Sequence, residues 1–276
     1  MTSVRPGASR PPQLLVFDSG VGGLSVAAEI QRALPGCAIA YASDNAAFPY
    51  GTKDEATLVD RVGRVLASLV NAVQPDVIVV ACNSASTLAL PHIRARFAAP
   101  IVGVVPAIKP AAALTRSRVI GLLATPGTVA RPYTHELITQ FAADCTVISL
   151  GSSALVEEAE ARLRGTPVDP ARLDELLRPL RDHPRYGEMD TLVLACTHFP
   201  LLRDDLQQWV GSAVQLVDSG EAIARRVEYW LSQLALPREN TRPEHLALFT
   251  RDDPEVARLA PALQRFGFEQ LRILPV

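Results

Sequence analysis

Short runs of apolar residues recur along the chain, separated by longer segments with helical periodicity. The runs are rich in Val, Ile and Leu and do not alternate with polar residues, which is typical of parallel strands covered on both faces. We predict strands at residues 14–17, 39–42, 77–80, 101–105, 119–123, 146–150, 191–194 and 214–217. One apolar helix face is marked by Leu58, Val62, Val65, Leu66, Leu69 and Val73. The alternation predicts an α/β fold with functional groups at the carboxyl ends of its strands.

Two halves of the chain share one pattern. In the first half, Asp18 follows one apolar run, and Cys82 follows another within the phrase Ala-Cys-Asn-Ser. In the second half, Thr125 and Cys196 take the corresponding places, and Cys196 lies in the phrase Ala-Cys-Thr-His. We therefore predict two similar α/β domains with mainly parallel sheets, related by a pseudo-twofold axis, with an active site in the cleft between them.

Composition narrows the class of protein. Of the 276 residues, 48% are hydrophobic and 20% are charged, which favours a packed core over disorder. The net charge of −2 argues against a nucleic-acid partner. No apolar stretch reaches the roughly 20 residues of a membrane span, and residues 1–12 lack the apolar run of a signal peptide. We expect a cytoplasmic protein that binds neither nucleic acid nor membrane.

The sequence also argues against several kinds of cofactor chemistry. Lys53 and Lys109 are its two lysines, and neither lies in a P-loop pattern, so a P-loop enzyme is excluded and a pyridoxal enzyme is disfavoured. The glycines at 20, 22 and 23 do not have the spacing of a dinucleotide fingerprint. The four cysteines are dispersed, without metal-ligand spacing. We expect no metal and no cofactor.

Cys82 and Cys196 are the strongest candidates for chemistry. Each directly follows a predicted strand and precedes residues that suit a helix N-terminus, where the helix dipole favours a thiolate. Burial in the core is the alternative for any single cysteine, and we prefer it for Cys37 and Cys145. Two thiols at equivalent places suit removal of a proton from one face of a carbon and its return from the other, with one thiolate and one thiol. Inversion at a carbon next to a carboxylate follows.

Three further segments are candidates for ligand binding. The glycine-rich turn at residues 18–23 lets main-chain amides approach an anion, although an ordinary tight turn explains it equally well. Residues 42–51 are too polar for the core and form either a substrate loop or a solvated connection. His198 lies two residues after Cys196, where it can exchange a proton or make a structural hydrogen bond.

These motifs resemble the glutamate racemase family. The resemblance is carried by DSGVGG at 18–23, FPYG at 48–51, ACNSAS at 81–86, CTHFPLL at 196–202 and VDSGEAI at 217–223. It implies a cofactor-independent enzyme that interconverts L- and D-glutamate and supplies D-glutamate for peptidoglycan. By the same resemblance, Cys82 and Cys196 are the acid/base thiols, assisted by Asp18 and His198. The implied substrate-binding residues are Asp18, Ser19, Tyr50, Gly51, Asn83, Ser84, Thr125, Thr128, Thr197 and His198.

The resemblance also implies a domain arrangement and partners. Residues 1–105 with 215–276 would form one discontinuous domain, and residues 106–214 the other. Residues 151–165 look like the enterobacterial type, in which a peptidoglycan precursor acts as an allosteric activator, and a homodimer is compatible with the family. Two alternatives stay open: a related racemase or isomerase acting on aspartate or hydantoins, and a non-catalytic role in regulating DNA gyrase.

Overall fold

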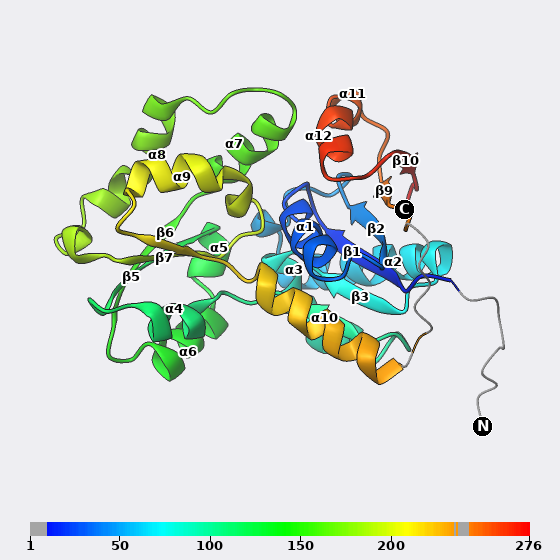
Figure 1. Ribbon diagram of the computed structural model, residues 1–276, viewed down its shortest axis with the longest axis horizontal. Coiled ribbons are helices and arrows are strands. Elements are labelled where there is room, and N and C mark those ends of the chain that lie inside the picture. Colours follow the sequence, from blue (N-terminus) through cyan, green and yellow to red (C-terminus); the bar gives the residue numbers. More distant parts are fainter. Residues whose placement is uncertain (1–9, 235, 237–242) are drawn as a thin grey trace.

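The structure, a computed structural model, describes residues 10–234, 236 and 243–276. It consists of two lobes, each built on a parallel sheet with helices on both faces (Figure 1). Every strand pair in both sheets is parallel. The predicted fold class is confirmed. No helix among the described residues is long and apolar enough to cross a membrane.

One lobe contains a six-stranded sheet with the order β10-β9-β2-β1-β3-β4. Its strands are β1 (Gln13–Asp18), β2 (Ala38–Ser43), β3 (Val77–Val80), β4 (Ile101–Gly103), β9 (Leu246–Phe249) and β10 (Gln270–Ile273). Its helices are α1 (Leu24–Ala33), α2 (Glu55–Val73), α3 (Asn83–Ile93), α10 (Gly220–Leu234), α11 (Pro254–Ala257) and α12 (Ala260–Arg265), with the 3-10 turn η1 (Tyr50–Thr52).

The other lobe contains a four-stranded sheet with the order β6-β5-β7-β8. Its strands are β5 (Val119–Ala124), β6 (Thr146–Gly151), β7 (Thr191–Leu194) and β8 (Gln215–Val217). Its helices are α4 (Ile108–Leu114), α5 (Pro126–Val129), α6 (Pro132–Phe141), α7 (Ala154–Leu163), α8 (Pro170–Arg181) and α9 (Arg203–Val210), with the 3-10 turns η2 (Tyr186–Glu188) and η3 (Phe199–Leu202).

The two sheets repeat one topology. Strands β2-β1-β3-β4 of the larger sheet have the same order as β6-β5-β7-β8 of the smaller one, with the first strand of each unit between its second and third. Asp18 ends β1, and Thr125 directly follows the equivalent β5. Cys82 lies two residues after β3, and Cys196 lies two residues after β7. The repeat therefore gives each lobe one thiol at the same edge of its sheet.

Burial on both faces explains why the strands are continuously apolar. In β1, Leu14 and Val16 face one core cluster while Leu15 and Phe17 face another, and all four side chains are buried. Burying a side chain of this size contributes about 1.5–3 kcal/mol to folding. The predicted apolar face of α2 packs over one side of this sheet, and its last member, Val73, is only partly buried. The double-sided core keeps the strand ends, and the site residues on them, in fixed positions.

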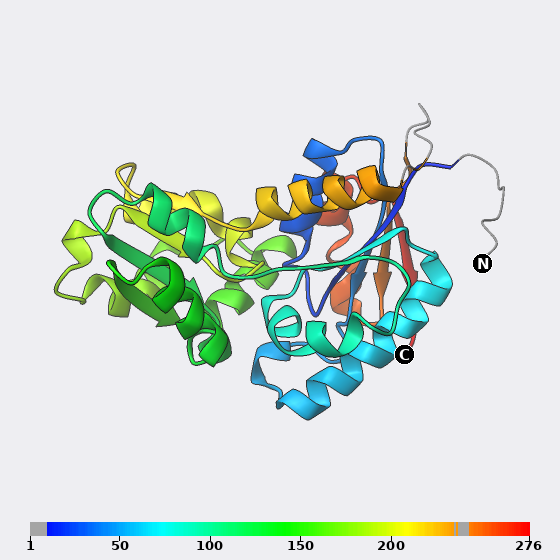
Figure 2. The same cartoon turned by 90° about the horizontal axis from the view of Figure 1, so that it is seen from below.

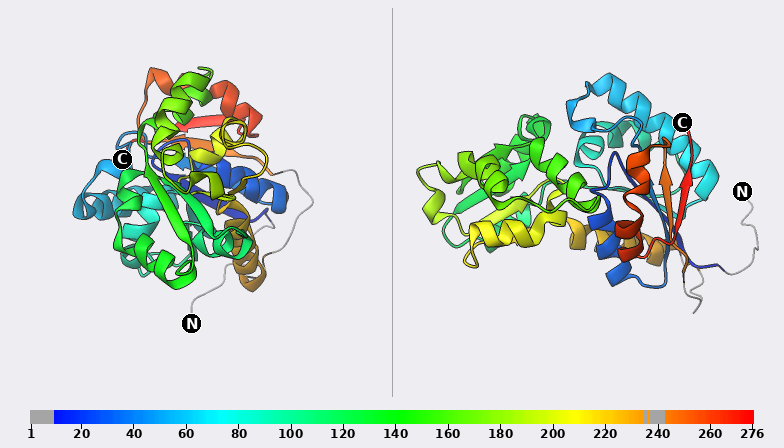
Figure 3. Two further views of the ribbon diagram at one scale, coloured as in Figure 1. Left: turned by 90° about the vertical axis from the view of Figure 1, so that its left-hand side faces the viewer. Right: turned by 90° about the horizontal axis from the view of Figure 1, so that it is seen from above.

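The eight predicted strands are present, with ends that differ by at most two residues. β9 and β10 were not predicted; they extend the larger sheet beyond β2 and pair in parallel. In Figures 1 and 3, α11 and α12 lie nearer the smaller lobe than these two strands do. Residues 1–9, 235 and 237–242 of the predicted first domain lie outside the described residues.

The chain passes between the lobes twice. It first crosses between β4 and α4, and it returns between β8 and α10, which packs against α1 of the larger lobe (Figure 2). β8, at residues 215–217, pairs with β7 in the smaller sheet, although the predicted boundary places all three of its residues in the first domain. The division into domains at the predicted residues stays a prediction.

Candidate active site

A pocket opens where the carboxyl ends of β1, β3, β5 and β7 face one another across the lobes. Both Cys82 and Cys196 line it, so the structure brings the two predicted thiols to one cavity. The other predicted residues along it are Asp18, Ser19, Tyr50, Gly51, Asn83, Ser84, Thr125, Thr197 and His198. Thr128 does not line the pocket but lies behind Thr125. It is fully buried and accepts a hydrogen bond from the Thr125 hydroxyl at 3.0 Å.

Cys82 is the N-cap residue of α3, and its environment favours the protonated thiol. Burial raises the pKa of this thiol, and the negative charge of Asp18 raises it further. The hydroxyl of Ser19 lies 3.8 Å from the sulfur. The start of α3 opposes these effects, since an amide of its first turn can donate to the sulfur. Burial and Asp18 outweigh it, so Cys82 is suited to hold a proton.

Cys196 has a different neighbour, the imidazole of His198. Nδ1 of His198 lies 3.7 Å from the sulfur, and Nε2 lies 2.9 Å from Oε1 of Glu160 on α7. Burial lowers the pKa of His198, but the hydrogen bonds with Cys196 and Glu160 outweigh burial and hold this pKa well above its usual value. A protonated His198 can donate to Cys196 and stabilise negative charge on its sulfur.

Glu160 was not among the predicted site residues. Only 3% of the residue is exposed. Burial raises the pKa of Glu160, but the hydrogen bond and charge of His198, the amide of Val21 and the charge of Arg164 together lower it below its usual value. Glu160 and His198 are therefore an ion pair behind Cys196. No sequence spacing indicates this pair, because the two residues lie on different elements.

The glycine-rich turn after β1 binds a carboxylate of the protein itself, the side chain of Glu160. Glu160 Oε1 accepts a hydrogen bond from the amide of Val21 at 2.8 Å. A Cβ atom on Gly20 would lie 2.4 Å from the same oxygen, and one on Gly22 would lie 2.5 Å from Nδ1 of His198. The turn is thus glycine-rich because side chains of the other lobe pack directly against its backbone.

Asp18 joins the two lobes at the base of the pocket. Its side chain is fully buried; Oδ1 accepts from the amide of Ser19 at 2.6 Å, and Oδ2 accepts from the hydroxyl of Thr197 at 3.0 Å. The carboxylate thus lies beside Cys82 and contacts the residue after Cys196. It can orient both strand ends without itself moving a proton.

Tyr50 lines the pocket, but its hydroxyl is used elsewhere. It donates to Oδ2 of the buried Asp44 at 2.6 Å, and burial together with that carboxylate raises the pKa of the phenol. Asp44 also accepts hydrogen bonds from Arg61 and Thr250. What Tyr50 and Gly51 present to the pocket is therefore the ring and the main chain.

Asn83 is left with an unsatisfied group. Its Oδ1 is buried and has no hydrogen-bond partner, although the side chain lines the pocket. An unpaired buried acceptor costs about 1–3 kcal/mol, so a ligand that donates a hydrogen bond, such as an ammonium group, would remove that penalty. The adjoining first turn of α3 provides main-chain amides that suit a carboxylate. A pocket with these groups fits an amino acid.

The described part of the chain has no group of three or more His, Cys, Asp or Glu side chains placed to hold a metal ion. Ser153 and Val156, around the start of α7, are further lining residues that were not predicted as site residues. Phe48 also lines the pocket and lies in the segment 42–51, which the sequence offered as a candidate binding loop.

The family follows from comparison with known proteins. A model of the Asp/Glu/hydantoin racemase family matches residues 22–227. A glutamate racemase of Salmonella typhimurium is 52% identical over 266 residues, which cover 96% of this chain and 93% of that protein. The chain belongs to the glutamate racemases of this family. A glutamate racemase of Pectobacterium atrosepticum is similar at 50% identity.

Solved structures agree with this assignment. The chain resembles Escherichia coli glutamate racemase, crystallised with L-glutamate and the activator UDP-MurNAc-Ala, with a TM-score of 0.90 and 48% identity, covering 97% of this chain and 99% of that one. A glutamate racemase isoform of Bacillus anthracis matches with a TM-score of 0.80 and 28% identity over 98% of both chains. The resemblance stated from the motifs is confirmed.

Proposed function

We propose that this protein is a cofactor-independent glutamate racemase that interconverts L- and D-glutamate. The observation that carries the proposal is the meeting of two thiols, Cys82 and Cys196, from equivalent strand ends of two lobes in one pocket. Identity of about 50% to glutamate racemases over 96% of the chain supports glutamate over aspartate or a hydantoin as the substrate.

The environments of the two thiols suggest their resting states. Cys196 acts as a thiolate beside the His198 imidazolium, and Cys82 acts as a thiol. The thiolate takes the α-proton from one enantiomer; the electron pair stays on the α-carbon as a carbanion, and Cys82 delivers its own proton to the opposite face. The products are the mirror-image amino acid, a Cys196 thiol and a Cys82 thiolate, which is the state needed for the reverse reaction.

The remaining predicted residues serve binding and orientation in this proposal. Asn83 accepts a hydrogen bond from the substrate ammonium group, and the amides at the start of α3 hold a carboxylate. Ser19, Ser84, Thr125 and Thr197 offer hydroxyls along the walls, and Gly51 offers its main chain. Asp18 and His198 assist Cys82 and Cys196 respectively, and Thr128 supports Thr125.

Several wider features belong to the same proposal. The product D-glutamate supplies peptidoglycan synthesis in the cytoplasm. The E. coli relative was crystallised with the activator UDP-MurNAc-Ala, and its 48% identity to this chain supports activation by a similar precursor here. We also propose a homodimer, and domains formed by residues 1–105 with 215–276 and by residues 106–214.

The test is racemisation by the purified protein. Circular dichroism should record the loss of signal from L-glutamate, and from D-glutamate, without added pyridoxal phosphate, metal or nucleotide. A chelator should leave the rate unchanged, and L-aspartate and a hydantoin should react much more slowly. A rate abolished by the chelator, or faster turnover of aspartate, would refute the assignment.

A further inference from the structure

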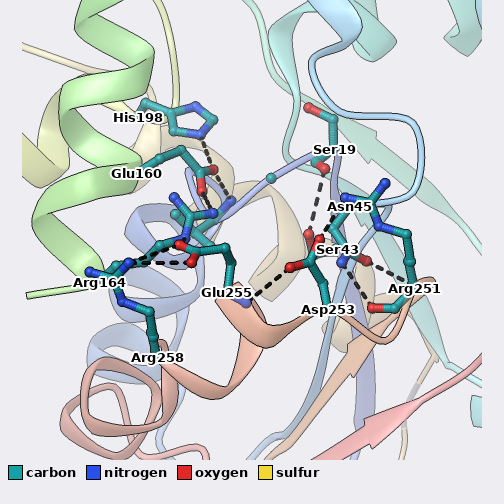
Figure 4. A network of polar contacts seen from close by, with 12 residues as sticks. Ser19, Ser43, Asn45, Glu160, Arg164, His198, Arg251, Asp253, Glu255 and Arg258 are labelled. Carbon is teal, nitrogen blue, oxygen red and sulfur yellow. Dashed lines mark hydrogen bonds and ion pairs between the residues drawn. The ribbon is translucent and has the colours of Figure 1, made fainter.

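Arg164, the C-cap residue that follows α7, reaches the carboxylate of Glu160, which lies behind Cys196. Its Nη2 donates to Oε2 of Glu160 at 2.6 Å, and the pair is largely buried, with side-chain exposures of 22% for Arg164 and 5% for Glu160. Figure 4 shows Arg164 on the far side of Glu160 from His198. Arg164 touches neither thiol and does not line the pocket that holds them.

The two oxygens of Glu160 have separate partners. Oε1 faces His198 Nε2 at 2.9 Å and accepts from the Val21 amide at 2.8 Å, whereas Oε2 is held by Arg164. A carboxylate rotates about its last carbon–carbon bond, so fixing one oxygen also fixes the direction of the other. A charge-assisted hydrogen bond in a largely buried position is strong enough to do this.

We propose that Arg164 is a positioning residue for racemisation, which fixes the plane of the Glu160 carboxylate and so keeps the His198 imidazole aligned on Cys196. The inference rests on the proposed function, since the alignment matters only if Cys196 exchanges a proton. Arg164 acts through Glu160 and His198, and three successive contacts connect it to the sulfur of Cys196.

A second ion pair of Arg164 is too weak to carry this role. Its Nε lies 3.5 Å from Glu255 on α11 of the other lobe and forms no hydrogen bond. Glu255 is half-exposed and also pairs with Arg258, beside a cavity of about 210 Å³. Exposed pairs of this kind contribute about 0–1 kcal/mol. The short contact to Glu160 therefore dominates.

Removing Arg164 should shift the pKa of Glu160 in a definite direction. The charged and titratable groups around the Glu160 carboxylate are His198, Arg164, Glu157, Tyr41, Glu255 and Arg258. The positive charge of Arg164 lowers the pKa of Glu160, so its loss raises that pKa. Protonation of Glu160 breaks the ion pair with His198. The acid limb of the activity profile should then move to higher pH.

The experiment compares Arg164→Met, Arg164→Lys and a control, Arg162→Met. Arg162 lies in the last turn of α7, two residues before Arg164, but pairs with Asp205 within its own lobe. We expect Arg164→Met to lower kcat on the order of tenfold with KM nearly unchanged, because small misplacements at a reacting group cost up to about 10²-fold. Arg164→Lys should recover most of this loss, and Arg162→Met should match wild type.

The outcomes separate a positioning role from a structural one. If Arg164→Met keeps the kcat and the acid limb of wild type, the inference is overturned. It is also overturned if the Met and Lys variants lose kcat equally and the acid limb does not move. An NMR titration of His198 reads the same pair without turnover: an unchanged titration in Arg164→Met also refutes the inference, even if wild type does not racemise glutamate. Inactive wild type, by contrast, refutes the proposed function.

Discussion

At the scale of single residues, the two thiols occupy equivalent places but have different neighbours. Cys82 lies beside the negative charge of Asp18, and Cys196 lies beside His198. If one sulfur removes the α-proton and the other supplies a new one, neither can complete the inversion alone. Cys82→Ala and Cys196→Ala should therefore each lower kcat by at least about 10³-fold in both directions, as is typical of groups that act as a unit.

Isotope incorporation checks the same point. In deuterated water, the enantiomer formed should carry deuterium at the α-carbon, while recovered substrate carries much less at early times. The control is Cys145→Ala, because Cys145 lies outside the pocket and should leave the rate unchanged. Near-normal turnover in either pocket variant, or equal early labelling of both enantiomers, would exclude the two-thiol mechanism.

The sequence predicted the residues on strand ends better than the residues behind them. Cys82, Cys196 and Asp18 could be predicted because each lies at the end of an apolar strand or within two residues of it, and the pattern occurs twice. Glu160 could not, since its partners Val21 and His198 are 139 and 38 residues away and no local pattern connects them.

At the scale of elements, the turn between β1 and α1 links lobe packing to chemistry. A Cβ atom on Gly20 would lie 2.4 Å from Glu160 Oε1 and 2.8 Å from the Phe48 ring. Gly20→Ala should displace Glu160, lower kcat by about 10–100-fold, and reduce the free energy of unfolding by about 1–3 kcal/mol through overpacking. Steady-state kinetics and urea unfolding measure the two effects.

Gly36→Ala provides the matched control. No atom lies within 4 Å of the position a Cβ would take there, and the backbone is not left-handed. This change should leave kcat unaltered. It should raise the free energy of unfolding by about 0.4–1 kcal/mol, because alanine lowers the conformational entropy of the unfolded chain. If Gly20→Ala behaved like Gly36→Ala, the close approach of Glu160 to the turn would contribute neither to turnover nor to stability.

Burial also explains which elements could be predicted. The eight predicted strands are apolar because helices cover both faces of their sheets. β9 and β10 extend one edge of the larger sheet, and β10 (Gln270–Ile273) is half polar with exposed residues. The edge strand β10 lacks the continuous apolar run on which the prediction depended. β9 (Leu246–Phe249) has such a run, lies between β10 and β2, and was missed nonetheless.

At the scale of the whole molecule, contacts between the lobes close the pocket from two sides. On one side, Thr197 donates to Asp18, and Glu160 accepts from Val21. On the other side, Arg131, the N-cap of α6, reaches across to α3. These bonds form only when the lobes are close, and we expect a glutamate held by residues of both lobes to favour the same arrangement.

Arg131 tests this coupling most directly. Its Nη1 donates to the main-chain oxygen of Ser84 at 3.1 Å and to the hydroxyl of Thr87, both on the helix that Cys82 caps. Hydrogen bonds to a charged group contribute about 1.5–3 kcal/mol, and partial exposure of the pair reduces this. If the free energy that favours closure of the lobes falls by about 1.4 kcal/mol, the affinity for glutamate falls tenfold.

Arg131→Met should therefore raise KM for both enantiomers by about tenfold while kcat changes less, because glutamate must then supply the free energy of closure that the arginine supplied. Arg172→Met is the control, since Arg172 pairs with Glu158 and Glu175 inside the smaller lobe and its loss should leave KM unchanged. L- and D-glutamate have equal free energies in water, so kcat/KM must fall by the same factor in both directions. A fall in kcat at unchanged KM would show instead that Arg131 acts on the chemical step through α3 and Cys82.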